Sequence, residues 1–151
     1  MNHKSHSITE TGPDLIPSGR YLDLKGGPLD FSSFRRLGPA TDGFQCTYDC
    51  IYVLNDPPPD QEKRVAVLKE WPSGRIMTLH TNTPGLQFFT GHKIPEKTVG
   101  KQGVCYGPLA GLCLEPRQFP IAVNIPGFPS VILRPGHIYR NAIRYVFSIE
   151  G

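Results

Sequence analysis

The stretch GLCLEPRQFPIAVNIPGFPSVILRPG, residues 111–136, carries the pattern that decides how the chain folds. It begins with Gly111 to Leu114, an apolar run short enough for one buried strand, and continues as a loop studded with prolines. Glu115 ends the strand. Because a Glu is seldom left inside a protein unless it is paired or has a task, Glu115 is a candidate general base. A strand-end carboxylate turned out to solvent fits the same spacing, since charged residues are mostly exposed.

Short apolar runs separated by turn residues continue on both sides of this stretch. The chain has 16 Gly and 16 Pro among its 151 residues, too many for long helices. They fall between the apolar runs, a distribution that is typical of an all-β protein. The predicted strands are residues 51–54, 64–69, 75–81, 86–90, 111–115 and 130–133. The second and third of these, joined around Pro72-Ser73-Gly74, indicate a hairpin.

The last strand, residues 139–149, has the clearest alternation, with a period of two that is nearly unbroken. One face would carry Tyr139, Asn141, Ile143, Tyr145, Phe147 and Ile149, and the other Arg140, Ala142, Arg144, Val146 and Ser148. Such a strand can bury one face against a second sheet.

Two segments depart from the strand pattern. A short helix is predicted over residues 31–37, with Asp30 as its N-cap and Gly38-Pro39 ending it. Residues 92–104 contain no apolar run and are interpreted as a mobile surface loop.

Length, charge and hydropathy exclude several classes of protein. A length of 151 residues suits one domain, which we expect over residues 8–151, with the polar residues 1–7 as a disordered tail. The net charge is +3 and no basic cluster is longer than Arg35-Arg36, so we expect no nucleic-acid partner. No apolar run approaches the roughly 18 residues of a membrane span, and residues 1–7 are unlike a signal peptide. We therefore expect a cytoplasmic protein with no membrane partner.

The four cysteines, Cys46, Cys50, Cys105 and Cys113, are an even number and could pair. In a reducing compartment, however, thiols stay free. Cys46-x-x-x-Cys50 also falls in a predicted strand, where it cannot form a tight zinc knuckle of the Cys-x-x-Cys kind. We expect free thiols, no metal site and no cofactor.

Four segments, in the same order along the chain, resemble the aldose 1-epimerases, also called galactose mutarotases. The family pattern Gly-x-x-Leu-Glu-x-x-x-Phe-Pro, then Asn-x-Pro-x-Phe-Pro and Leu-Arg-Pro-Gly, is similar to residues 111–136. The other segments are Ile8 to Thr11 running to Leu15 to Gly19, Tyr48-Asp49, and Thr83 to Gly91. Family members usually run to more than twice this length, so the resemblance, over residues 8–147, corresponds to their C-terminal half.

The resemblance implies a fold and a chemistry. The fold is a partial antiparallel β-sandwich of the galactose mutarotase type, with a sugar bound in an open cleft. Mutarotation interconverts the α and β anomers of aldoses such as galactose or glucose, and Glu115 would be its general base. Asp49 and Gln87 would contact the sugar. Taken without the family, Asp49 also fits a solvated strand or turn carboxylate, and Gln87 a sheet-surface amide.

The general acid has no assigned residue. In the family a catalytic histidine and a second sugar-contacting histidine lie in the N-terminal half, and neither has a counterpart among His3, His6, His80, His92 and His137. His92 could stand in, although an exposed imidazole at a turn is our expectation for it, and for His137 a solvated turn. After Glu115 the chain has Pro116-Arg117, where Thr-Gln is common in the family, which could alter the geometry of the base.

Three hypotheses therefore stay open. The chain is an aldose 1-epimerase of low activity, or a carbohydrate-binding or interaction protein without turnover, or a truncated product with no function of its own. Half a sandwich leaves an uncovered apolar face and unpaired strand edges. We therefore also expect self-association, or a partner that covers this face, most simply through the strand 139–149.

Overall fold

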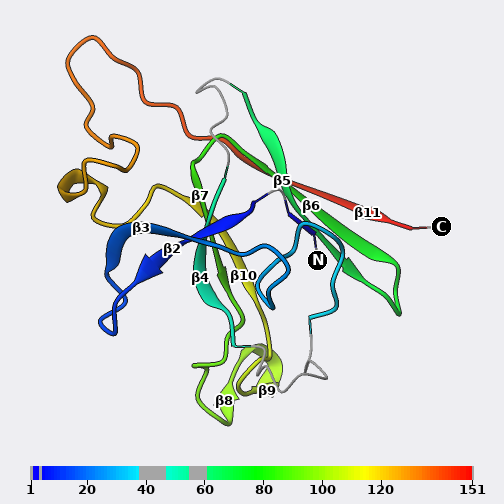
Figure 1. Ribbon diagram of the computed structural model, residues 1–151. Coiled ribbons are helices and arrows are strands. Elements are labelled where there is room, and N and C mark those ends of the chain that lie inside the picture. The colour runs from blue at the N-terminus through cyan, green and yellow to red at the C-terminus, as the bar shows by residue number, and fades with distance from the viewer. Residues whose placement is uncertain (1, 4, 38–46, 55–60, 151) are drawn as a thin grey trace.

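The computed structural model describes residues 2–3, 5–37, 47–54 and 61–150. Cys46 and the turn expected over residues 55–60 lie outside the described residues. The described chain consists of short strands and two single-turn 3-10 helices, η1 (Lys101–Gly103) and η2 (Ala122–Asn124) (Figure 1). The prediction of an all-β chain is confirmed, and no helix in these ranges is long and apolar enough to cross a membrane.

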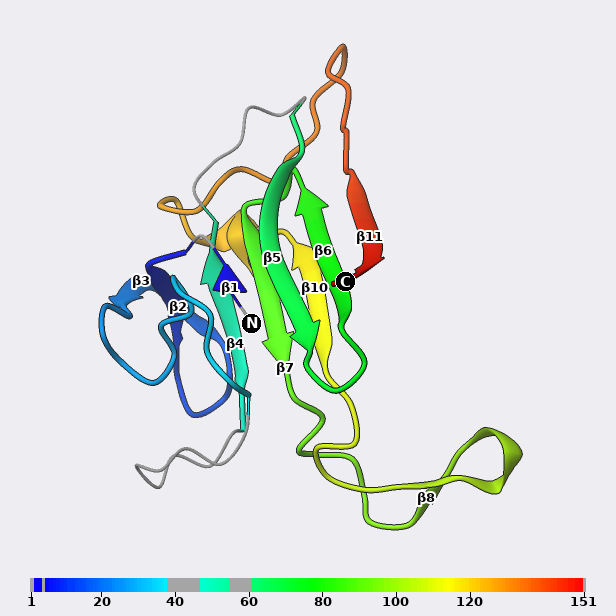
Figure 2. The ribbon, with the colours of Figure 1, turned by 90° about the vertical axis from the view of Figure 1, so that its right-hand side faces the viewer.

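Two antiparallel sheets pack face to face (Figure 2). The four-stranded sheet has the order β1 (Asn2–His3), β5 (Lys63–Glu70), β6 (Arg75–Thr81) and β11 (Ile143–Ile149). The five-stranded sheet has the order β10 (Cys113–Arg117), β7 (Gly85–Phe89), β4 (Asp49–Val53), β2 (Ser7–Thr11) and β3 (Pro17–Asp23). A ribbon of β8 (Thr98–Val99) and β9 (Cys105–Tyr106) projects from one end of the body (Figure 1). The predicted antiparallel sandwich is confirmed.

The predicted hairpin forms from β5 and β6, which pair from Lys63 opposite Thr81 to Glu70 opposite Arg75. Its turn needs Gly74, whose φ of 67° lies in the left-handed region that favours glycine. A Cβ at Gly74 would also lie 2.9 Å from the carbonyl oxygen of Glu150. The hairpin therefore depends on glycine both for its backbone and for the close approach of the C-terminal segment.

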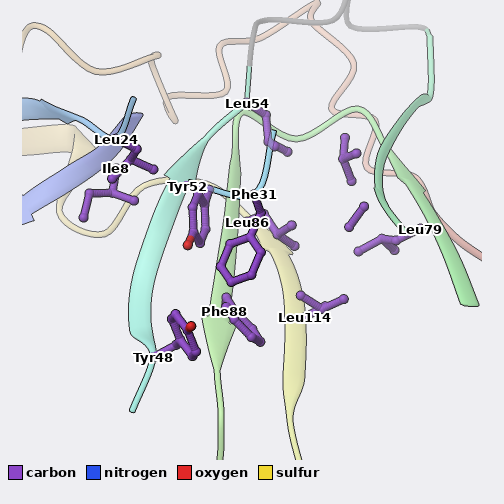
Figure 3. Packing of buried hydrophobic residues seen from close by; sticks show 12 residues of the cluster. Ile8, Leu24, Phe31, Tyr48, Tyr52, Leu54, Leu79, Leu86, Phe88 and Leu114 are labelled. Carbon is purple, nitrogen blue, oxygen red and sulfur yellow. The ribbon is translucent and has the colours of Figure 1, made fainter. Parts of the chain in front are cut away.

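The main core fills the space between the two sheets, because alternate residues of each strand point inward. Tyr52, Leu86 and Phe88 come from the five-stranded sheet, and Ala66 and Leu79 face them from the other. Figure 3 shows Phe31 entering this cluster from a loop, between Tyr48, Tyr52 and Phe88. The Phe88 ring stacks on Tyr48 at a centroid distance of 4.9 Å and lies edge-on to Phe31 at 5.9 Å.

A second, smaller cluster lies on the outer face of the five-stranded sheet. Phe119 and Phe128, from the loop after β10, pack with Ala122 and with Ile51 of β4. Tyr21 of β3 stacks on Phe128 at 5.8 Å. The proline-rich stretch therefore folds back over part of this face and leaves the rest of it open.

Several local expectations were wrong. Residues 31–37 form no helix, because Phe31 is fully buried in the core and the Asp30 carboxylate instead accepts the backbone N–H groups of Gly26 and Ser32 in a turn. Residues 130–133 form no strand: Val131, Ile132 and Leu133 are exposed and pair with nothing in the sheets. Apolar content alone does not make a strand when no partner edge is within reach.

The ends of the chain also differ from expectation. The last strand begins at Ile143 rather than Tyr139, because the Asn82 side chain binds the Arg140 carbonyl and the Ala142 N–H in place of a ladder partner. Within the tail expected to be disordered, β1 pairs with β5, and Ser5 is buried and donates to the Val53 carbonyl. The loop 92–104 contains β8 and η1.

Candidate functional site

Three neighbouring strands, β4, β7 and β10, bring the predicted site residues together. Glu115 lies directly opposite Gln87, and Gln87 lies directly opposite Ile51, two positions from Asp49. Residues that face each other across antiparallel strands project to the same side of the sheet. Since Tyr52, Phe88 and Leu114 point into the core, Asp49, Gln87 and Glu115 share the outer face, beside the second cluster.

A chain of hydrogen bonds runs across this face. The Gln87 amide Nε2 donates to Asp49 Oδ1 at 2.7 Å, and Lys93 Nζ donates to Asp49 Oδ2 at 2.6 Å. At the other end, an Arg117 guanidinium nitrogen donates to Gln87 Oε1 at 3.3 Å. The Asp49 side chain is 25% exposed and the Lys93 side chain is 55% exposed, so water and salt reach this ion pair and weaken it. Each oxygen of Asp49 has one partner and keeps a lone pair with which it can accept a further hydrogen bond from a ligand.

A pocket of about 370 Å³ opens at the same place. Its polar wall is made by Asp49, Gln87 and Arg117, and its apolar wall includes Leu15, Leu22 and Pro120. Clefts of roughly 300–1,000 Å³ with mixed walls are usual for small-molecule sites. This pocket therefore has the size and lining for one hydroxylated ring.

Glu115 lies on β10, the edge strand, and its side chain is exposed. Its carboxylate makes no hydrogen bond or ion pair with the residues that the structure describes, and Glu115 does not line the 370 Å³ pocket. Its place directly opposite Gln87 still puts it next to the pocket wall. A carboxylate in this position is free to accept a proton from a ligand, and it equally fits the solvated strand-end Glu that the spacing allows.

His92 differs from the exposed imidazole expected at this turn. It is half-buried, its ring packs against Phe89 at 5.1 Å, and its Nδ1 is buried with no hydrogen-bond partner in the described chain. The side chains of Lys93, Asp49, Gln87 and Arg117 form a polar row across this face. Phe89 is opposite Asp49, so the imidazole lies at one end of this polar row. His137, by contrast, is exposed after a turn, as predicted, with its N–H bonded to the Arg134 carbonyl.

The thiols described by the structure are free. Cys105 and Cys113 are exposed, whereas burial raises the pKa of the Cys50 thiol to about 12. No group of three His, Cys, Asp or Glu side chains in the described ranges could hold a metal ion. The side chains gathered on this face carry carboxylate, amide, ammonium, guanidinium and imidazole groups.

Sequence reasoning missed two members of the polar row, Lys93 and Arg117. Arg117 could have been found, since alternation puts it on the same face as Glu115, two residues earlier. Lys93 had no such signal. It reaches Asp49 only because the chain turns sharply after β7, at Gly91, whose φ is 65°.

Comparison with known proteins places this fold and these residues in context. The sequence profile named Aldose 1-epimerase matches residues 2–146. Galactose mutarotase from Sus scrofa and that from Homo sapiens are each 34% identical over 137 residues, which is 89% of this chain and 39% of theirs. Aldose 1-epimerase from Streptococcus thermophilus is 29% identical over 133 residues, 85% of this chain and 37% of its own.

A solved structure agrees with the fold. The crystal structure of a GalM/aldose epimerase homologue from C. elegans superposes with a TM-score of 0.86 at 24% identity, covering 99% of this chain and 45% of that one. The chain thus spans about two-fifths of the length of the curated relatives that it matches. With the profile covering nearly every residue, the chain belongs to the aldose 1-epimerase family.

Proposed function

We propose that the face formed by Asp49, Gln87 and Glu115 binds the ring of an aldose such as galactose or glucose, with Glu115 as the general base for interconverting its anomers. One observation carries the proposal: three residues from distant parts of the sequence lie in adjacent register on β4, β7 and β10. The polar side chains of Asp49, Gln87 and Arg117 line a pocket beside an apolar cluster, and this arrangement supports a binding role.

Each residue has a role that its chemistry suits. The Asp49 carboxylate can accept two sugar hydroxyls, and the Gln87 amide can donate to one and accept from another. Glu115 would take the proton from the anomeric hydroxyl. The bond between the anomeric carbon and the ring oxygen then breaks, and the ring oxygen needs a proton from an acid. Closing the ring on the other face of the carbonyl reverses these transfers and gives the second anomer.

No residue of this chain is assigned as the general acid that protonates the ring oxygen. By resemblance it is a histidine without a counterpart here, and the Lys93 side chain on this face is bound to Asp49. Loss of one positioned proton-transfer group costs about 10² to 10⁴ in rate. We therefore expect the 151-residue chain by itself to have low mutarotase activity, or none.

Polarimetry on freshly dissolved α-galactose and α-glucose tests the proposal. Any rate above the uncatalysed one should be lost in Glu115→Gln and kept in the control Glu96→Gln, an exposed carboxylate in the loop after β7. A rate that survives Glu115→Gln contradicts the role of Glu115. Full turnover, as fast as that of a complete family member, contradicts the missing acid.

A second candidate, carbohydrate binding without turnover, is favoured by one observation. The carboxylate of Glu115 has no hydrogen-bond partner among the described residues, so no acid is held against it. Calorimetry separates the two functions. Galactose binding that is weakened in Gln87→Leu, together with no catalysed mutarotation, would identify a binding protein.

A further inference from the structure

Among the described residues, no carboxylate pairs with the guanidinium of Arg117. The side chain is exposed, and its hydrogen bond to Gln87 Oε1 is 3.3 Å long and ends on a neutral amide. Lys93, by contrast, is paired with Asp49 at 2.6 Å. Because a guanidinium has five N–H donors, the Arg117 side chain in the pocket wall keeps donors for a ligand.

The direction of the Arg117 side chain is informative, because a carboxylate lies close by. Glu115 is two residues earlier on β10, so both side chains project from the same face with their Cα atoms roughly 6–7 Å apart. Yet the guanidinium turns toward Gln87 on β7 and lines the pocket, and it forms no ion pair with Glu115. Arg117 therefore presents its charge to the pocket.

Thr9 gives a second, independent observation on the same pocket. It lines the pocket from β2, on the side away from β10, and is 3% exposed. Its hydroxyl Oγ1 is buried with no hydrogen-bond partner in the described chain. Since most buried side-chain polar atoms have a partner, this hydroxyl is available to a polar group of a ligand. The pocket thus offers hydrogen-bonding groups at both of its sides.

The charges on this face decide which anion suits Arg117. The Asp49–Lys93 pair is neutral as a whole, and Glu115 adds a negative charge two residues from Arg117. A phosphate ester carries about −1.5 to −2 charges near neutral pH, more than one guanidinium balances. A carboxylate carries one charge, and its two oxygens match the guanidinium fork. A carboxylate is therefore the better partner.

The chemistry of a sugar ring indicates where this carboxylate would be. In a pyranose, the anomeric carbon and the carbon that bears C6 flank the ring oxygen, so a ring with its anomeric hydroxyl at Glu115 directs C6 along β10. The neighbours of Glu115 on this face of β10 are Cys113 and Arg117, and of these Arg117 lines the pocket. We propose that the bound sugar is a uronic acid, an aldose with a carboxylate at C6, and that Arg117 binds this carboxylate. The inference rests on the proposed function, since it names the substrate class of the same site.

Calorimetry of the chain with galacturonate, its methyl ester and galactose, at pH 7 and low salt, tests the inference. We expect galacturonate to bind about tenfold more tightly than galactose, as one hydrogen-bonded charge pair allows. The methyl ester keeps the shape and loses the charge, so it should bind like galactose. Added salt should reduce the preference, because it screens the charges.

Two variants separate recognition of charge from positioning of Gln87. Arg117→Gln keeps a donor for Gln87 and loses the charge, so the ratio of the galactose and galacturonate dissociation constants should fall to about one. If Arg117 only positions Gln87, both affinities change together and the ratio stays, which overturns the inference. The control Arg75→Gln removes the same charge from the other sheet, where the side chain is 74% exposed, and should keep the ratio.

The opposing outcomes are distinct from a failure of the proposed function. Galactose binding that is lost in Gln87→Leu, with no preference for galacturonate in the unchanged chain, overturns the uronic acid and is consistent with the sugar site. Tighter binding of galactose 6-phosphate than of galacturonate overturns the carboxylate as the recognised group. Binding of none of these sugars overturns both proposals.

Discussion

Replacing Phe88 by alanine tests whether the inter-sheet core supports the central strand of the site. Phe88 is fully buried on β7, between Gln87 and Phe89, and its ring contacts Tyr48 and Phe31. Phe→Ala in a core costs about 3–5 kcal/mol. Ring pairs contribute about 0.5–1.5 kcal/mol each, and Phe88 has two of these. We therefore expect a loss of about 4–5 kcal/mol in the free energy of unfolding.

The assay is urea denaturation followed by circular dichroism, with the midpoint read at a constant slope. The matched control is Phe34→Ala, which removes a ring that is 54% exposed and lies 5.3 Å from Lys69 Nζ. That change should cost no more than about 1 kcal/mol, the value of an exposed cation–π contact. If Phe88→Ala costs as little as the control, the two sheets do not share the core described here.

Two further predictions follow from the pKa values of described groups. Hydrogen bonds from the Gly26 N–H and from Ser32 lower the pKa of Asp30 from 3.8 to about 2, so its ionised form stabilises the fold at higher pH. That contribution is lost as pH falls from about 4 to about 2, and acid unfolding of Asp30→Asn should lack this part of the pH dependence. Among the described thiols, Cys105 and Cys113 should react with a thiol reagent at pH 8, while Cys50, whose pKa is raised to about 12, reacts only after unfolding, as peptide mass mapping would show.

The alternation of apolar and polar residues was enough to predict most strands. β6 and the β5–β6 hairpin follow from the run 75–81 and from the turn at Gly74, because both signals are local. Residues 130–133 have the same apolar character, but the predicted strand does not form there. A strand also needs a partner edge, and whether one is in reach depends on the whole fold. The helix predicted over residues 31–37 does not form for the same reason, because burial of Phe31 in the core overrides a local helical signal.

Only part of the candidate site could be predicted from the sequence. Motifs in the sequence identified Glu115, Asp49 and Gln87 as site residues. That these residues lie close together depends on the strand order β10-β7-β4, which local patterns do not encode. Lys93 was missed because its contact with Asp49 joins two segments that meet only in the folded chain. The Arg117 contact with Gln87 was available from alternation once the pairing of β10 with β7 was known.

A nitrogen-15 NMR titration of the chain with galactose tests the central claim most directly. We expect the amide signals of Asp49, Gln87 and Glu115 to shift together with one dissociation constant, along with the side-chain amide of Gln87. Signals of the β8–β9 ribbon and of the inter-sheet core should stay where they are. Shifts confined to another part of the molecule, or none at saturating sugar, would contradict a sugar site on this face.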